Sequence, residues 1–554
     1  MTTPTAFPRR RLLQGGASLG LTGLTGLTGL TGLTGLAPSW AQAPAAGATT
    51  GTPVRGGTLT VLIDPEPPTL TTIAHSAGAS VLISAKTTEG LLTYDFDLSP
   101  QPQLATAWSV SSDGLQYTFA LRRGVKWHDG KPFTSADVAH SIGLLKQYHP
   151  RGRATFSSVA EVRTPDAYTA VLVLSKPVPY LLTALSAAES PIVPKHLYES
   201  GKADANPNNN APIGTGPFVF KEWVRGSHVT YERNPEYWDN PKPYVDRLIV
   251  RFIPDAAARA AAIEKGEVHL SPGTPVPLGD VERLRAKPNL VFEPNGYQYI
   301  NNVSRVEFNL ENPALQDLRV RQAIAHAINR QVVQKTVWYG QGRLIPGPVH
   351  PALKKFYVPD LPVLPHDVKQ AEALLDAAGF TRGKAGGNLR LKLALVPIPN
   401  EGGQRTAEYL KQSLGRIGIE VTIGAQDFAT YVRRVYADRA FDLHVSVMSN
   451  TFDPTVGIQR LYWSKNFKKG LPFSNGSGYS NPEVDRLLEA AAVEVDEGRR
   501  SAAFAEFQRH IVRDLPDITL LALDNYTIAD RRVRGHTVSA DGIAGNLAGA
   551  WIGA

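Results

Sequence analysis

Residues 111–125 read Ser-Ser-Asp-Gly-Leu-Gln-Tyr-Thr-Phe-Ala-Leu-Arg-Arg-Gly-Val, and this stretch shows which kind of fold to expect. Apolar residues alternate from 117 to 121, as in a half-buried strand, and the Ser-Asp-Gly at 112–114 supplies a turn before it. Thr134, followed by an aspartate three residues later, predicts a capping box that opens a helix through Leu145. The region therefore predicts a strand followed by a helix.

The same kinds of pattern recur outward along the chain. Buried or half-buried strands are expected at 57–63 and 419–423, and helical spacing of apolar residues is found at 317–337, 365–378, 405–414 and 482–495. Gly379 follows one of these helices and suits the left-handed position that ends a helix. Helices between strands, with a β-hairpin near residue 115, indicate an α/β chain whose lobes each hold a mixed sheet.

The first 48 residues have the order of a secretory signal. Three arginines at 9–11 precede two leucines, and five Leu-Thr-Gly triplets at 21–35 form a weakly apolar stretch. Small residues around Ala43 and Ala48 offer cleavage sites, and the paired arginines predict export by the twin-arginine route. The alternatives are a disordered basic tail or a retained membrane helix, which needs roughly 20 predominantly apolar residues.

Composition agrees with an exported globular protein. The chain has no cysteine, which excludes disulfides, thiolate metal sites and a lipidated cysteine, so we expect a free periplasmic protein without a lipid anchor. The net charge falls from +8 to +5 if the three signal arginines are removed. No basic run is long enough to suggest nucleic-acid binding.

A series of short motifs resembles the signature of the family-5 extracellular solute-binding proteins. In chain order they are LATAW (104–108), DGLQYTF (113–119), LRRGVKWHDGKPFT (121–134), DV (137–138), GTGPF (214–218), RNPEYW (233–238), FN (308–309), LRVRQA (318–323) and FD (441–442). The agreement extends from about residue 56 to 532. These proteins are the oligopeptide, dipeptide and nickel binders of ABC importers.

The resemblance implies a two-lobed periplasmic binding protein fold of type II, in its large three-subdomain form, with mixed sheets and a hinge made of two chain crossings. Lobe I would hold a discontinuous core domain at 49–89, 196–298 and 524–554, with an inserted subdomain at 90–195. Lobe II would be 299–523. The crossings near residues 299 and 523 would form the hinge about which the lobes close on a ligand.

Motifs that would indicate chemistry are weak. His128 and Asp129 resemble a catalytic pair but stand in the family's turn between strand and helix, and the Gly-x-Gly at 214–216 lacks the remainder of a phosphate loop. The chain has no H-E-x-x-H, and its G-x-S-x-G at 16–20 lies within the expected signal rather than in a strand-to-helix elbow. We therefore expect no enzyme activity, no catalytic residue, no cofactor and no metal site.

The segment 442–454 is where the resemblance places the loop that borders the ligand cavity of lobe II. Peptide binders of the family resemble one another in an acidic residue three positions before the Asp/Glu-Pro pair, and this carboxylate holds the α-ammonium of the peptide. This sequence has Asn450 there. An amide accepts a hydrogen bond but cannot neutralise a charge, so either Asp453 takes over the anchoring role or the ligand lacks a free α-amine.

Each of the other substrate-binding candidates also has a plain structural interpretation. Asp453 is either an anchor or the cap of the segment after Pro454, and Phe428 is either an aromatic cavity wall or a core residue under the loop. The remaining candidates are His444, for which a satisfied core histidine is the favoured interpretation, Met448 on the same segment, and Tyr297 and Tyr299 near the first crossing.

The sequence thus predicts a monomeric periplasmic substrate-binding protein that captures a peptide or peptide-like solute by hinge closure and delivers it to a membrane permease with its ATPase subunits. A non-peptide solute (a metal chelate, an opine or an oligosaccharide) is the alternative within the binding class. A sensory binding protein and a periplasmic hydrolase are the alternatives from other classes.

Overall fold

A computed structural model describes residues 51–273, 275–383 and 388–553. The expected signal at 1–48 lies outside the described residues. Among the described residues no helix is both long and apolar enough to cross a membrane.

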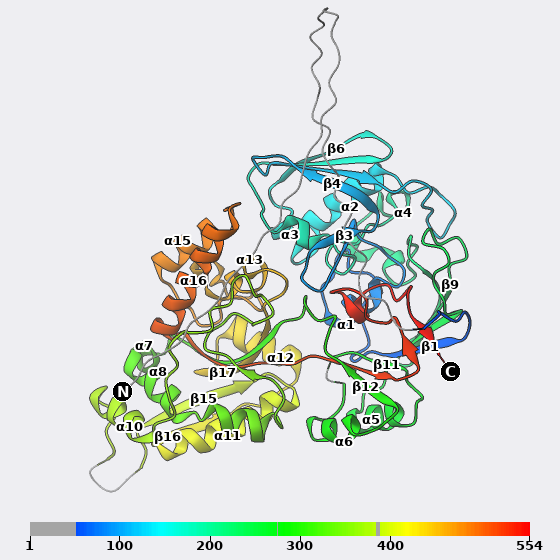
Figure 1. Cartoon of the computed structure of the whole chain (residues 1–554). Helices are drawn as coiled ribbons and strands as arrows, with labels where there is room; N and C mark the ends of the chain where they lie inside the picture. The colour runs from blue at the N-terminus through cyan, green and yellow to red at the C-terminus, as the bar shows by residue number, and fades with distance from the viewer. Residues whose placement is uncertain (1–50, 274, 384–387, 554) are drawn as a thin grey trace, which may run out of the picture. The chain divides into compact units, whose positions relative to one another are not determined.

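A seven-stranded mixed sheet occupies one part of the fold (Figure 1). Its strands in spatial order are β12 (Leu290–Glu293), β19 (Thr527–Asp530), β11 (Leu270–Ser271), β1 (Thr58–Leu62), β10 (Arg247–Arg251), β9 (His228–Arg233) and β8 (Phe218–Val224). β1 runs parallel to both β10 and β11, and the outer pairs are antiparallel. The helices α5 (Ala256–Glu264) and α6 (Val281–Arg285) cover one face, and α1 (Gly78–Ser84) packs on the other.

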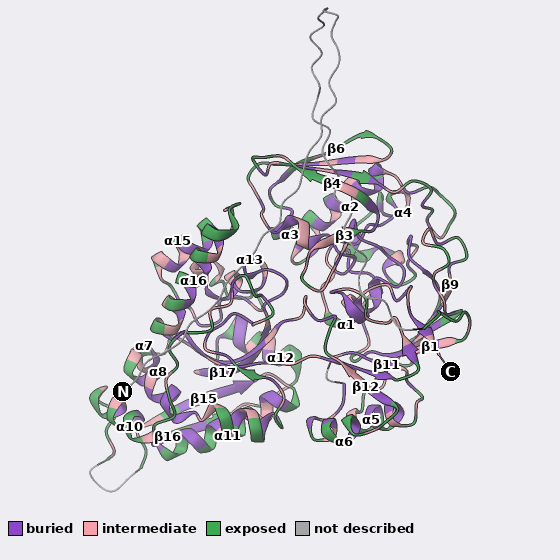
Figure 2. Ribbon diagram, viewed as in Figure 1, coloured by how far each residue is buried: buried purple, intermediate pink, exposed green. Residues whose placement is uncertain are grey.

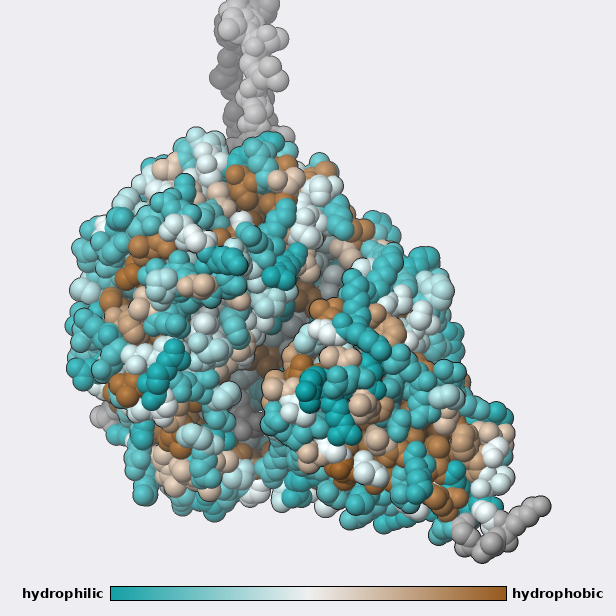
Figure 3. Space-filling view, turned by 180° about the vertical axis from the view of Figure 1, so that it is seen from behind, coloured by the Kyte–Doolittle hydropathy of each residue, from teal (hydrophilic) through white to brown (hydrophobic). Residues whose placement is uncertain are grey.

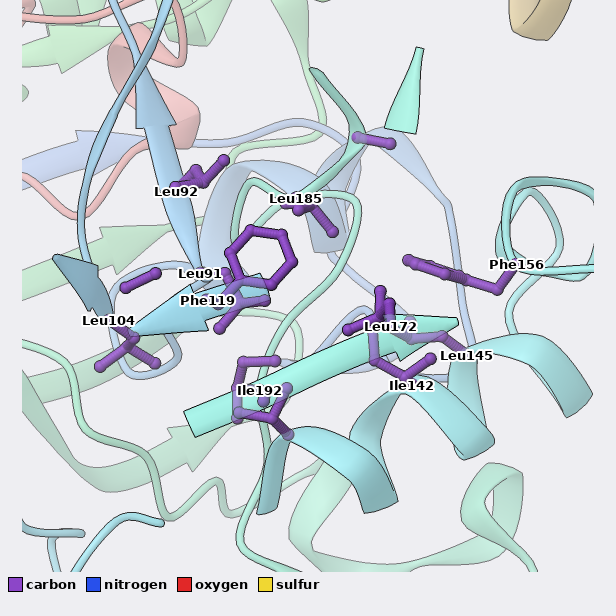
Figure 4. Close-up of a cluster of buried hydrophobic side chains, with 14 of the residues drawn as sticks. Leu91, Leu92, Leu104, Phe119, Ile142, Leu145, Phe156, Leu172, Leu185 and Ile192 are labelled. Carbon is purple, nitrogen blue, oxygen red and sulfur yellow. The ribbon is translucent and has the colours of Figure 1, made fainter. Parts of the chain in front are cut away.

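A four-stranded antiparallel sheet is inserted after β1. It contains β4 (Ala105–Val110), β5 (Gln116–Leu121), β7 (Thr169–Leu174) and β6 (Val159–Asp166). The helix α2 (Ser135–Gln147) packs its apolar face on this sheet (Figure 4). The alternation expected for β5 is observed, and the expected capping box is present, with the Thr134 N–H 2.8 Å from Asp137 Oδ2. Nearby lie the short β2 (Leu92–Tyr94), β3 (Pro100–Pro102), α3 (Gly152–Thr155) and α4 (Lys195–Tyr198).

The second large sheet has six strands. In spatial order they are β14 (Arg343–Leu344), β18 (Asp517–Ala522), β13 (Asn302–Phe308), β17 (Leu443–Ser449), β15 (Leu391–Pro397) and β16 (Ile419–Ile423). One face is covered by α8 (Leu318–Ala327), α10 (Val368–Ala377) and α11 (Glu401–Arg416), and the other by α15 (Pro482–Ala491) and α16 (Glu497–Asp514). Figure 2 shows buried and exposed faces along these helices.

The helix expected over 317–337 is interrupted. α8 ends at Ala327 because Ile328 is extended, and Asn329 caps a new start at α9 (Arg330–Val332), which continues as a wider turn through Val333–Val337. The Asn329 Oδ1 accepts two backbone N–H groups, and this cap starts a new helix where the apolar spacing had suggested one continuous helix. Gly379 has φ +90°, as expected after α10.

The chain passes between the two large sheets twice. Residues 294–301 lead from β12 to β13, and residues 523–526 lead from β18 to β19. We call the part with the seven- and four-stranded sheets lobe I and the part with the six-stranded sheet lobe II. A groove runs between them in Figure 3.

Candidate functional site

The loop after β17 lies against the first chain crossing. The Asn450 N–H donates to the Asn301 carbonyl at 2.8 Å, and Asn301 Nδ2 donates to the Thr451 carbonyl at 2.8 Å. The Phe452 ring lies 5.3 Å from the Tyr299 ring, and Phe452 is buried in the apolar cluster of lobe I. The loop is therefore held between the two lobes at the crossing.

Asn450 is almost fully buried, and its side-chain Oδ1 accepts the His350 backbone N–H at 2.6 Å. Gly457 packs directly on the Asn450 backbone, because a Cβ at this glycine would lie 2.0 Å from the Asn450 carbonyl oxygen. The amide is thus fixed in place by a backbone donor. Whether it contacts a ligand stays a prediction.

Asp453 is engaged within lobe II. Its carboxylate caps α13 (Pro454–Gly457) by accepting the Thr455 N–H at 2.8 Å. It also makes a two-pronged ion pair with Arg500, with 2.8 Å from Nη1 and 2.5 Å from Nη2. Burial raises the pKa of the neighbouring Tyr180 hydroxyl, and the Asp453 charge adds to that increase. An ammonium anchor at Asp453 would have to compete with Arg500.

Tyr299 and Tyr297 lie on the first crossing but face different partners. The Tyr299 hydroxyl donates to the Thr183 carbonyl at 2.9 Å, and its ring lies 5.6 Å from that of Tyr94. The Tyr297 hydroxyl accepts the Gly273 N–H at 2.8 Å and lies 2.8 Å from Thr527 Oγ1. Tyr299 therefore lies beside the loop, whereas Tyr297 ties the crossing to the seven-stranded sheet.

His444 and Met448 lie on β17 under the loop. Both are buried, and Met448 belongs to the apolar cluster between the six-stranded sheet and α15–α16. His444 Nε2 lies 3.3 Å from Glu307 Oε1, and His444 Nδ1 lies 3.4 Å from the Tyr431 hydroxyl. In this conformation the structure surrounds both candidates with core residues.

Glu307 belongs to a buried charged network. Arg305 Nη1 donates to Asp517 Oδ2 at 2.9 Å, Arg305 Nη2 pairs with Glu307, and the Tyr462 hydroxyl donates to Asp517 Oδ2 at 2.6 Å. Burial by itself lowers the pKa of Arg305, but Glu307, Tyr462 and Asp517 more than offset this and raise it. Burial raises the pKa of Glu307, yet Arg305, His444 and Arg439 together outweigh burial and hold that pKa below its usual value. This network joins β13 and β18 in the core of lobe II, below the loop.

Phe428 is the most exposed of the candidates, with 54% of its surface accessible. It opens α12 (Phe428–Val432), and its ring stacks on Phe473 at 6.2 Å and on Tyr431 at 6.1 Å. An exposed aromatic face of this kind can stack on a planar group of a ligand.

Several residues of this region gave no signal in the sequence. Arg500 is 47 positions from Asp453, and Arg460 and Phe473 lie in segments without a recognisable motif. Phe473 and Thr451 both have the left-handed backbone that non-glycine residues rarely adopt, with φ of 55° and 54°. Only the folded chain brings these groups together.

Comparison with known proteins agrees with this architecture. The model of the bacterial extracellular solute-binding proteins, family 5 Middle, matches residues 99–470. The dipeptide-binding protein of Escherichia coli K12 is 26% identical over 462 residues, covering 79% of this chain and 83% of that protein.

Two solved structures are also similar. The oligopeptide-binding protein AppA from Bacillus subtilis, in complex with a nonapeptide, has a TM-score of 0.78 at 25% identity and covers 91% of this chain and 100% of its own. The binding protein AgaA from A. tumefaciens R10, in complex with agropinic acid, has a TM-score of 0.74 at 27% identity and covers 90% of this chain and 99% of its own.

Two mixed sheets joined by two crossings, with a fixed loop between the lobes, define a solute-binding protein of the periplasmic type. The chain belongs to family 5 of the bacterial extracellular solute-binding proteins. This is a family of substrate-binding proteins rather than of enzymes.

Proposed function

We propose that this protein is the periplasmic binding subunit of an ABC importer, that it captures a peptide or peptide-like solute between its lobes, and that it presents the closed complex to a membrane permease with its ATPase subunits. The observation that carries the proposal is the family match over 99–470, together with a dipeptide-binding and an oligopeptide-binding relative. Capture requires no chemistry by this chain, and the protein acts as a monomer.

The lobe boundaries follow the two crossings, with lobe I at 49–298 and 524–554 and lobe II at 299–523. Contacts between the lobes support closure about this hinge. The Leu278 N–H of lobe I donates to Glu401 Oε2 of lobe II at 3.1 Å, and Phe452 of lobe II packs in the apolar cluster of lobe I. Closing in this way buries a bound solute and distinguishes loaded protein from empty protein.

Asn450, Phe428 and Tyr299 are the best placed of the candidates to contact a solute. They offer an amide, an exposed aromatic ring and a tyrosine beside the crossing. Asn450 in place of a carboxylate favours a second candidate function, the capture of a solute without a free α-ammonium, and the AgaA complex with agropinic acid is an example of a solute other than a peptide in this fold.

Solute binding is expected to close the hinge and stabilise the protein. The protein is first refolded from denaturant to remove any co-purified solute, and the solute is identified by mass spectrometry of that extract. Adding the solute back should reduce the radius of gyration in small-angle scattering and, at a concentration 100 times Kd, stabilise the fold by about 2.7 kcal/mol. Tight binding with an unchanged radius of gyration would contradict hinge closure.

Export by the twin-arginine route is tested at the N-terminus. Changing Arg9, Arg10 and Arg11 to lysine is expected to reduce strongly the mature protein that reaches the periplasm, because this route reads the paired arginines. Cell fractionation with immunodetection measures the effect. Undiminished export of the variant would assign the protein to the general secretory route.

A further inference from the structure

Arg460 lies on α14 (Gln459–Tyr462), directly beside the candidate loop. Its guanidinium donates to three backbone carbonyl groups, those of Gly457 at 3.2 Å, Phe473 at 2.5 Å and Ser449 at 3.4 Å. A guanidinium has five N–H donors, so two remain for another partner. Gly457, whose carbonyl accepts from Arg460, also packs on the Asn450 backbone and so connects Arg460 to the candidate loop.

Arg460 differs from its neighbouring arginines in its charge balance. Arg500 is neutralised by Asp453, and Arg151 of lobe I is neutralised by Glu189, with 2.5 Å between Nη2 and Oε1. Among the residues that the structure describes, no carboxylate lies within ion-pair distance of Arg460. The side chain is nevertheless partly buried. Carbonyl groups orient this cation without neutralising it.

The electrostatics of the surroundings reinforce this imbalance. Burial lowers the pKa of the Arg460 guanidinium to about 10, and the positive charges of Arg151 and Arg305 act in the same direction against Tyr436. Val456 on the preceding α13 packs against the apolar cluster of lobe I, which places this part of lobe II next to the other lobe. An anion placed here would offset a partly desolvated positive charge, an arrangement in which charge-assisted hydrogen bonds are strong.

The two loops that hold Arg460 also carry the strained residues of this region. The Ser449 and Phe473 carbonyl groups both accept from Arg460. Phe473 itself and Thr451, two residues after Ser449, have the left-handed backbone conformation. Strain of this kind persists where the surrounding structure needs it, and such residues cluster at binding sites. Phe473 also stacks on the exposed Phe428, with 6.2 Å between the ring centroids.

We infer that the captured solute carries an anionic group and that Arg460 binds it between the lobes. The inference rests on the proposed function and specifies its substrate class as acidic solutes, or peptides read through a carboxylate rather than through the α-ammonium. The uncharged amide of Asn450 fits this class, because it offers no carboxylate to a peptide α-ammonium.

The test compares two libraries of N-acetylated tripeptides that differ only at the C-terminus, one with a free carboxylate and one amidated. Refolded protein is incubated with an equimolar mixture, and the retained peptides are counted by mass spectrometry after ultrafiltration. Wild type is expected to retain the free acids at least about tenfold over the amides, since the amides lack the charge that pairs with Arg460. Arg460→Gln should bring this ratio close to one, and Arg460→Lys should give an intermediate ratio. Arg486→Gln, an exposed arginine on α15, is the matched control.

The outcomes separate the inference from the proposed function. Equal retention of both libraries by wild type, or a ratio that Arg460→Gln leaves unchanged in a folded variant, overturns the inference and leaves peptide capture intact. Retention of neither library, together with Arg460-dependent binding of a sugar phosphate mixture, supports the anion site and restricts it to solutes other than carboxylate peptides. Binding of none of these probes overturns the inference, whereas peptide capture through the α-ammonium is tested separately with unmodified peptides. Melting temperature and circular dichroism establish that each variant is folded.

Discussion

Replacing Arg305 with methionine is expected to lower the free energy of unfolding by about 3–5 kcal/mol, the largest effect of any single change considered. Arg305 joins Glu307 on its own strand β13 to Asp517 on β18, and the side chains of all three residues are almost completely buried. Methionine fills similar space but leaves two carboxylates without their cation in the core of lobe II. Chemical denaturation followed by circular dichroism measures the loss.

A pH series distinguishes lost charge pairing from lost packing. In wild type Arg305, with His444 and Arg439, holds the pKa of Glu307 below its usual value, so that this carboxylate stabilises the fold above its ordinary pKa of about 4.3 and ceases to do so as the pH falls. In the variant, only His444 and Arg439 oppose the effect of burial, so the pKa of Glu307 rises and protonation at acid pH relieves the penalty. The deficit should therefore shrink from pH 7 toward pH 4. Arg319→Met, which removes an exposed pair with Asp317, should leave the transition nearly unchanged. A deficit independent of pH would indicate packing instead.

The second large effect concerns the charge at position 450. Wild type is expected to bind ordinary zwitterionic dipeptides and tripeptides weakly, and Asn450→Asp is expected to improve their binding by roughly 2–5 kcal/mol, because the closing cleft then offers a carboxylate to the peptide ammonium. The aspartate can still accept the His350 N–H that Asn450 accepts at 2.6 Å, so the loop should keep its conformation.

Isothermal titration calorimetry with a mixed peptide library measures this change. Asn388→Asp makes the same change of charge at an exposed position of lobe II and should leave binding as in wild type. If the Asn450→Asp protein binds peptides no better than this control, the prediction that the ligand site lies at the loop is wrong. Asp453→Asn is a poorer test of anchoring, because it also breaks the buried pair with Arg500.

Local patterns were enough to predict many of the elements. The alternation at 117–121 predicted β5, the Thr134 cap predicted the start of α2, and Gly379 marked the end of α10. Such features depend on backbone geometry within a few residues, which is why a single sequence reveals them. The interruption at Ile328 was missed, since apolar spacing alone cannot show that the following asparagine caps the start of a new helix.

The family and its two-lobed fold were also predicted from the sequence, because the motifs recur in order along almost the whole chain and the family match bears this out. The ligand-contact residues stay predictions. Sequence offered two roles for Asp453, and only the folded chain shows its carboxylate capping α13 and pairing with an arginine 47 positions away.

The same reason accounts for everything else that only the tertiary structure decided. The Arg305 network joins strands that are distant in the chain, and Arg460 is held by carbonyl groups of three separate segments without a carboxylate partner among the described residues. The charge state and availability of a side chain depend on what packing places beside it. The sequence by itself therefore determined most of the elements, the family and the fold class, whereas long-range packing decided which charged groups of the described residues are paired in the core and which have no charged partner.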